Sequence, residues 1–208
     1  MANITMDQIK KLREWSGAGI MDCKAALSET DGDMDKAMEA LRKKRADIAA
    51  SKAHRATKNG IVGSYLHVRA DGGVPSLGVL VEVLCETDFA ARAKPFKDFV
   101  NNLCLHIAMA NPQWLTKADV PAAVIEKEKC LYKEQLKETG KPEAILDKIA
   151  EGKLTKFFAE SCLLEQQYAL AADKSEQKAI AEMVKDTIGQ IGENITIRRF
   201  VRFDLGSE

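Results

Sequence analysis

The residues with the most potential for chemistry lie together at Glu86-Thr87-Asp88-Phe89, directly after an apolar stretch. One interpretation is structural: Thr87 or Asp88 caps the next helix, and Phe89 covers the edge of a sheet. The other is functional, because an aromatic ring beside a carboxylate at the rigid end of a strand makes a good anchor for a protein partner. The residues alone favour the capped helix start and leave the second interpretation open.

Enzyme chemistry finds little support in the sequence. Cys85 could act as a nucleophile beside His67 and Asp88, but nothing near it would stabilise a thiolate. The GxxxxGK[ST], HExxH, GxSxG and EF-hand patterns are absent, and Gly17-Ala18-Gly19 follows a predicted helix, which indicates a turn. His106 lies among apolar neighbours and is typical of a core histidine. We therefore predict no catalytic residue, no cofactor and no metal site.

Two basic stretches, residues 42–45 and 52–58, raise the alternative of an RNA-binding module. The chain carries 31 basic and 31 acidic residues, so it lacks the basic excess that is typical of nucleic-acid binders. Cations are also favoured near the C-terminus of a helix. We interpret residues 42–45 as a solvated helix flank and expect no direct contact with nucleic acid.

Composition indicates a globular protein of a reducing compartment. The chain has 208 residues, of which 46% are hydrophobic and 30% charged. Its five cysteines are widely spaced and include no CxxC pair, which predicts free thiols. No apolar run approaches the roughly 18 residues of a membrane helix, and the first residues do not resemble a secretory signal. We expect a cytoplasmic protein that does not enter a membrane.

The elements that precede the Glu86–Phe89 segment begin with three short helices. Thr5 predicts a capping box with the glutamine three residues later, and Gly17-Ala18-Gly19 ends the first helix. Asp22 is the expected cap of the second helix and Asp33 the cap of the third. Their small apolar residues predict a compact bundle.

Strand patterns start after this bundle. Residues 61–68 and 77–84 predict a hairpin, with a turn at Asp71-Gly72-Gly73, and residues 195–203 predict a final strand. The second strand is apolar at nearly every position, so we expect helices on both faces of the sheet.

Helical periodicity fills the rest of the chain. The predicted helices span residues 94–110, 120–140, 142–163 with an interruption at Gly152, and 175–192. The fold class is therefore α+β. A small three-helix bundle over residues 1–54 precedes a helix-rich domain over residues 55–208, which holds an antiparallel sheet of about three strands.

Two sequence motifs, which follow one another along the chain as they do in the family, resemble the elongation factor Ts family, the exchange factors for the GTPase elongation factor Tu. The first is the acidic residue and Thr-Asp-Phe triplet at residues 86–89, and the second spans residues 12–27. Leu84 and Ala90 depart from residues that the family often has, and neither lies in the triplet. The resemblance implies that the N-terminal bundle is similar to a ubiquitin-associated domain.

The resemblance also implies a mechanism and a set of binding residues. Phe89 would wedge between two helices of the GTPase domain, Asp88 would hold the contact by hydrogen bonding, and Thr87 and Glu86 would shape the turn. Disturbing the magnesium site would then release GDP. The N-terminal contact region or its supporting core would include Leu12, Arg13, Gly17, Ile20 and Met21.

Length adds one further expectation. The chain is shorter than the long bacterial forms of the family, whose core holds two related sheet-bearing subdomains. The strands predicted here supply about one subdomain. Short members can compensate by pairing two copies through their sheets, so the resemblance leaves a homodimer as a possible state.

Overall fold

The computed structural model describes residues 4–68, 72–137, 143–171 and 177–206. The chain folds into two compact units, each assembled from segments that are distant in sequence. The first unit combines Met1–Ile61, Val83–Phe99 and Met183–Thr196. The second combines Val62–Glu82, Val100–Glu182 and Ile197–Glu208. The boundary predicted between residues 54 and 55 stays a prediction.

The first unit contains the predicted three-helix bundle, formed by α1 (Met6–Ser16), α2 (Ile20–Glu29) and α3 (Met34–Lys52). Two predicted caps are confirmed. Thr5 forms a capping box with Gln8, and the Asp33 side chain accepts hydrogen bonds from two backbone N–H groups of α3. The bundle core consists mainly of small and medium-sized apolar side chains, Ile9, Leu12, Ala18, Cys23, Ala26, Leu27, Ala37 and Leu41.

The turn between α1 and α2 differs in one detail from the prediction. Gly17 ends α1 in the left-handed conformation, with φ of 64°, as the glycine pattern predicts. The N-cap of α2 is Gly19 and not Asp22, which lies within the first turn of the helix. Because Ile20 and Met21 already adopt helical geometry, Asp22 lies inside the helix, beyond the cap position. It pairs instead with Lys44 of α3 at 2.6 Å.

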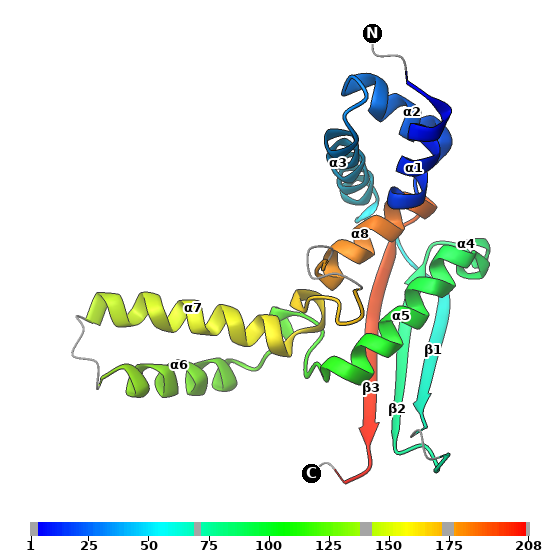
Figure 1. The fold of residues 1–208 in the computed structure, drawn as a ribbon. Coiled ribbons are helices and arrows are strands. Elements are labelled where there is room, and N and C mark those ends of the chain that lie inside the picture. Colours follow the sequence, from blue (N-terminus) through cyan, green and yellow to red (C-terminus); the bar gives the residue numbers. More distant parts are fainter. Residues whose placement is uncertain (1–3, 69–71, 138–142, 172–176, 207–208) are drawn as a thin grey trace. The chain divides into compact units, whose positions relative to one another are not determined.

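Three strands form the sheet in the order β1-β2-β3 (Figure 1). β1 spans Asn59–His67, β2 Leu77–Cys85 and β3 Ile195–Asp204, so all three predicted strands are confirmed. Helix α5 (Lys94–Ala110) covers one face, and Val79, Val81 and Val83 of β2 are buried there. The turn predicted at Asp71-Gly72-Gly73 lies partly outside the described residues.

The opposite face of the sheet remains exposed, so the prediction that helices cover both faces is wrong for the described chain. Along β2, buried residues alternate with residues that are intermediate or, at Leu80, exposed, so only every second residue packs beneath α5. Five large apolar side chains on this face or at its rim are exposed, Val62, Leu66, Leu80, Val201 and Phe203. The apolar residues of β2 therefore do not predict that helices of this chain cover both faces of the sheet.

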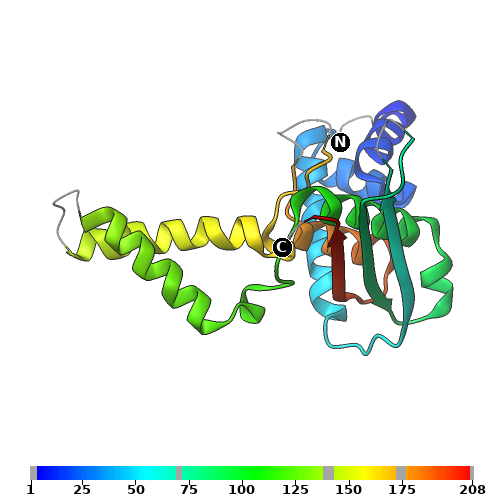
Figure 2. The ribbon, with the colours of Figure 1, turned by 90° about the horizontal axis from the view of Figure 1, so that it is seen from below.

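In the second unit, α6 (Ala122–Lys137) and α7 (Glu143–Ser161) lie side by side as a hairpin in both views (Figures 1 and 2). The predicted interruption at Gly152 is wrong, because α7 continues through it. One glycine costs a helix only about 1 kcal/mol relative to alanine. Helix α8 (Ile180–Ile191) and the short helix α4 (Asp88–Arg92) complete the α-helices of the described residues. The observed elements confirm the α+β class.

We expect opposite effects from adding a methyl group at two glycines. A β-carbon at Gly63 of β1 would overlap the side chains of Val100 and Cys104, whereas one at Gly152 would meet nothing within 4 Å. Gly63→Ala should lower the free energy of unfolding by about 1–3 kcal/mol. Gly152→Ala should raise it by about 0.5–1 kcal/mol. Urea denaturation measures both, and a stabilised Gly63→Ala variant would contradict the packing of α5 on the sheet.

Candidate partner-binding site

The segment from Glu86 to Phe89, here called the tip, links the end of β2 to α4. Thr87 is the N-cap of α4: its backbone is extended, and its Oγ1 accepts a hydrogen bond from the Ala90 N–H at 3.3 Å. The capped helix start is therefore confirmed. Ala90 and Ala91 are buried, so α4 turns one side toward the interior.

Phe89 points the other way. Its side chain is 79% exposed, so the interpretation that it covers the sheet edge is wrong. Alanines occupy the inward positions of α4, and the phenylalanine is left on the outward side. Its neighbour Asp88 pairs with Arg92 one turn later at 3.0 Å, and both side chains are largely exposed. The tip thus combines a capped, fixed backbone with an exposed aromatic ring.

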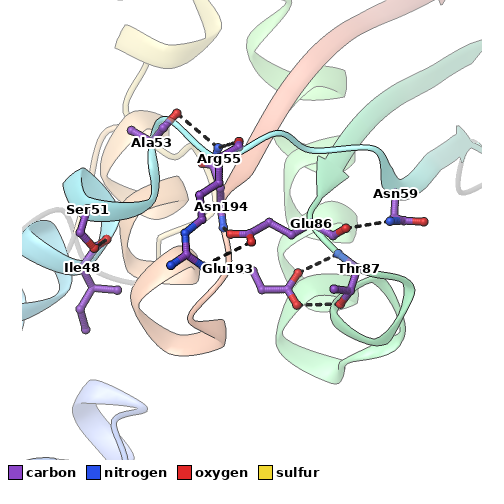
Figure 3. Close-up of polar contacts among 9 residues, drawn as sticks. All are labelled: Ile48, Ser51, Ala53, Arg55, Asn59, Glu86, Thr87, Glu193 and Asn194. Carbon is purple, nitrogen blue, oxygen red and sulfur yellow. Dashed lines mark hydrogen bonds and ion pairs between the residues drawn. The ribbon is translucent and has the colours of Figure 1, made fainter.

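Thr87 is held from outside its own helix by Glu193, which lies between α8 and β3 (Figure 3). The Glu193 carboxylate accepts hydrogen bonds from the Thr87 N–H at 2.9 Å and from its hydroxyl at 2.6 Å. Hydrogen bonds to a charged acceptor are stronger than those between neutral groups. This pair of bonds fixes both the backbone and the side chain of the capping residue.

Glu86 makes the reciprocal contact with the next residue of the same turn (Figure 3). Its carboxylate accepts from the Asn194 N–H at 2.7 Å and from the Arg55 guanidinium at 3.4 Å. The carbonyl of Glu86 accepts from the Asn59 side chain at 2.7 Å. The Asn194 N–H, and to a smaller extent Arg55, hold the pKa of Glu86 below its ordinary value of 4.5.

Sequence reasoning missed Glu193, Asn194, Arg55 and Asn59. Glu193 lies 106 positions from Thr87, and Asn194 lies 108 positions from Glu86. No local pattern predicts pairing over such distances. The one hint is composition, because an acidic and an amide residue directly after a helix-ending glycine suit a turn with free donors and acceptors.

The predicted N-terminal contact residues separate into two groups. Leu12 is fully buried in the bundle core, and Gly17 shapes the turn. Arg13, Ile20 and Met21 lie on the surface, with Met21 76% exposed. Among the described residues outside its flanking strand and helix, the tip forms hydrogen bonds with Arg55, Asn59, Glu193 and Asn194. The tip and the N-terminal contact region belong to the same compact unit.

The basic segment at residues 42–45 is only partly a solvated flank. Arg42, Lys43 and Lys44 are exposed as predicted, and Lys44 pairs with Asp22. Arg45 instead has a largely buried side chain. Its guanidinium donates to the Ser16 carbonyl at 2.6 Å and lies 3.9 Å from the Asp186 carboxylate of α8. The prediction is wrong for Arg45, because that side chain packs between α1 and α8.

The structure does not bring Cys85 and His67 together, as the alternative of a thiol enzyme requires. Cys85 is buried, its thiol donates to the Thr87 carbonyl at 3.1 Å, and burial raises its pKa. The Lys58 N–H bonds to the Cys85 carbonyl just before β1, whereas His67 lies at the other end of that strand. His106 is a core histidine as predicted, bonded through Nε2 to Gln166 at 2.9 Å.

Other classes of site gain no support in the described ranges. All five cysteines are free. Within the residues that the structure describes, no group of three or more His, Cys, Asp or Glu side chains could hold a metal ion. None of the helices described is both long enough and apolar enough to span a membrane.

Comparison with known proteins gives the family. The sequence profile described as Elongation factor TS matches residues 18–175. The chain is 48% identical over 203 residues to Elongation factor Ts of Thermosipho melanesiensis, covering 98% of this chain and 99% of that protein. It is 49% identical over 205 residues to Elongation factor Ts of Pseudothermotoga lettingae, covering 99% of each chain.

A third relative, Elongation factor Ts of Geobacter metallireducens, is 51% identical over 204 residues, which cover 98% of this chain and 90% of that protein. The chain is by class a translation elongation factor, and it belongs to the elongation factor Ts family. The resemblance drawn from the two sequence motifs is confirmed.

The contacts of Glu86 predict a dependence of stability on pH. Because its pKa is lowered in the folded state, its contribution is complete above 4.5 and is lost as the pH falls through the lower folded-state pKa. The melting temperature of the wild type should therefore fall more steeply than that of Glu86→Gln between about pH 5 and pH 3. Thermal unfolding followed by circular dichroism measures this.

Glu126→Gln is the matched control, because Glu126 is an exposed glutamate of α6. Its curve should run parallel to that of the wild type over the same range. If the Glu86→Gln curve is also parallel to the wild type, the carboxylate does not hold the tip in the way described.

Proposed function

We propose that this chain binds elongation factor Tu in its GDP form and promotes release of GDP, with Phe89 as a wedge in the GTPase domain. The observation that carries the proposal is the exposure of Phe89 directly after a backbone segment that hydrogen bonds hold in place. Its ring is 79% exposed, while the capping residue Thr87 is bonded to Glu193 by both backbone and hydroxyl. A stiff aromatic side chain on a rigid support loses little conformational entropy on binding.

The wedge acts on GDP through the partner. Magnesium requires near-ideal octahedral geometry, so a small shift of the segments around it weakens its binding, and with it that of GDP. Linkage then requires that GDP weaken the binding of this chain by the same factor. The mechanism asks for no nucleophile, general base, cofactor or metal on this chain, and we propose that it is not an enzyme in the usual sense.

Asp88 suits the role of a hydrogen-bonding clamp. Its carboxylate pairs with Arg92, but both side chains are more than half exposed. An exposed pair of this kind contributes only about 0–1 kcal/mol. The carboxylate can therefore exchange Arg92 for a donor of the partner at small cost, beside the ring of Phe89.

The N-terminal bundle supplies the second contact in this proposal. Arg13, Ile20 and Met21 are exposed, and Met21 is flexible enough to fit an irregular surface. Leu12 and Gly17 support them from the core and the turn. Direct contact with RNA has no place in the proposal, because Lys44 and Arg45 of the basic segment already have partners within the chain. We place this action in the cytoplasm, where translation occurs.

Release of labelled GDP from elongation factor Tu tests the proposal. The wild-type chain should accelerate release at micromolar concentration, and Phe89→Ala should reduce the acceleration by about 30-fold or more, as loss of an interface hot spot does. Met109→Ala truncates another exposed apolar side chain, 62% exposed on α5, and should have little effect. Absence of acceleration by the wild type, or equal loss in both variants, would contradict the wedge.

We further propose that two copies pair through the exposed face of the sheet. Leu66, Leu80 and Phe203 give this face an apolar surface that α5 does not cover. Glu82 lies on the same face, where Arg198 and Arg199 bind its two carboxylate oxygens at 2.9 Å and 2.7 Å. Both oxygens of the Glu82 carboxylate are thereby paired, so this acid would not be left as an unpaired charge against a second copy.

Leu80→Lys should convert a dimer into a monomer, because it places a charge in the centre of the apolar face. Leu131→Lys is the matched control: Leu131 of α6 is 45% exposed, against 44% for Leu80. Sedimentation at micromolar concentration distinguishes the two states. A monomeric wild type, or a Leu80→Lys variant that still dimerises, would contradict this interface.

A further inference from the structure

We propose that Glu193 and Asn194 are the positioning residues of the exchange tip, and that they fix the tip relative to the chain leaving the N-terminal bundle. This inference rests on the proposed function and adds residues that lie outside both family motifs. The contacts are reciprocal: Glu193 binds Thr87, while Asn194 donates to Glu86, the residue before it (Figure 3). Two dipeptides thus hold each other through their backbones and side chains.

Glu193 controls the cap of α4. The Thr87 hydroxyl donates a hydrogen bond to Glu193, which leaves the lone pairs of its oxygen free to accept a hydrogen bond from the Ala90 N–H. Helix α4 spans only Asp88–Arg92, and a helix of this length does not form in isolation. Its direction, and with it the direction of Phe89, therefore depends on bonds from outside the helix.

Asn194 holds the other side of the turn. Its side-chain amide donates to the carbonyl of Arg55 at 2.8 Å and to that of Ala53 at 3.4 Å. The side chain is buried, with 4% of Asn194 exposed, so these bonds replace bonds to water. Ala53 and Arg55 directly follow α3, which makes Asn194 the point where the chain leaving the bundle meets the tip.

Helix α8 carries the turn and is itself fixed to the bundle. It passes so close to α3 that a β-carbon at Gly189 would lie 2.5 Å from Arg45 Cγ. The Arg45 guanidinium also reaches the Ser16 carbonyl at the end of α1 and the Asp186 carboxylate of α8. The position of the bundle is thereby transmitted along α8 to Glu193.

A fixed relation between the bundle and the tip has a physical advantage for a two-point contact. Once the bundle is bound, the wedge needs no further ordering, so less conformational entropy is lost. Weakening the bonds of the turn at residues 193–194 should therefore slow GDP release without removing any residue that touches the partner. Glu193 and Asn194 act through Thr87 and Phe89.

Glu193→Gln tests the inference while keeping the size of the side chain. If the new NH2 group faces the Thr87 N–H, that bond is lost; if it faces the hydroxyl, the bond can form only with the hydroxyl as acceptor. In either case the remaining bonds lose the charge of the carboxylate. We expect the acceleration of GDP release to fall by about 10-fold. In a Phe89→Ala background the same change should add almost no further loss, because both act on one contact. Glu151→Gln, at an exposed position of α7, is the matched control and should leave exchange unchanged.

Hydrogen exchange of the free chain provides a readout that does not involve the partner. The Ala90 and Ala91 amides bond to the Thr87 side chain and carbonyl, and they should exchange about 10-fold faster in Glu193→Gln. Amides within α5 should keep their wild-type rates. Thr87→Val removes the same hydroxyl bond from the other side and should speed exchange at Ala90 similarly.

Unchanged hydrogen-exchange rates of the Ala90 and Ala91 amides in both variants would overturn the inference. So would a Glu193→Gln loss of GDP-release activity that adds in full to the loss caused by Phe89→Ala. If the wild-type chain fails to accelerate GDP release, the proposed function falls. The hydrogen-exchange rates would still decide whether Glu193 positions the tip.

Discussion

The arrangement of the tip depends first on the Glu193 carboxylate, which binds both donors of Thr87. Glu193 accepts from the backbone and from the hydroxyl of Thr87, and that hydroxyl in turn caps α4. A helix of five residues has almost no stability of its own. The cap and the carboxylate behind it therefore determine where Phe89 points, and the buried end of β2 determines where the cap lies.

An exposed phenylalanine needs a reason to stay exposed. Ala90 and Ala91 fill the inward side of α4, so rotating the helix to bury Phe89 would replace two small side chains by a large one. It would also break the bonds between Thr87 and Glu193. The same structure that stabilises the fold thus prevents the ring from collapsing onto it, which makes exposure of the ring compatible with a single native state.

Local signals in the sequence predicted what depends on neighbouring residues. The caps at Thr5, Asp33 and Thr87 were correct because a cap and its donors lie within three positions of each other. The cap predicted at Asp22 is wrong because the two apolar residues before it already belong to the helix. The positioning residues could not be predicted, since Glu193 and Thr87 lie 106 positions apart and are neighbours only because β2 and β3 are adjacent in the sheet. Their identity is a property of the topology and not of any segment.

The hydrogen bonds of the acids around the tip also bear on the alternative of an enzyme. Each oxygen of the two carboxylates accepts from a different donor: those of Glu193 from Thr87, and those of Glu86 from Asn194 and Arg55. General acid–base catalysis needs a carboxyl group that can exchange a proton with a substrate at a pKa near the working pH. The pKa of Glu86 is displaced in the opposite direction, below 4.5. Carboxylates committed in this way make the turn rigid, and this turn carries the exposed ring of Phe89.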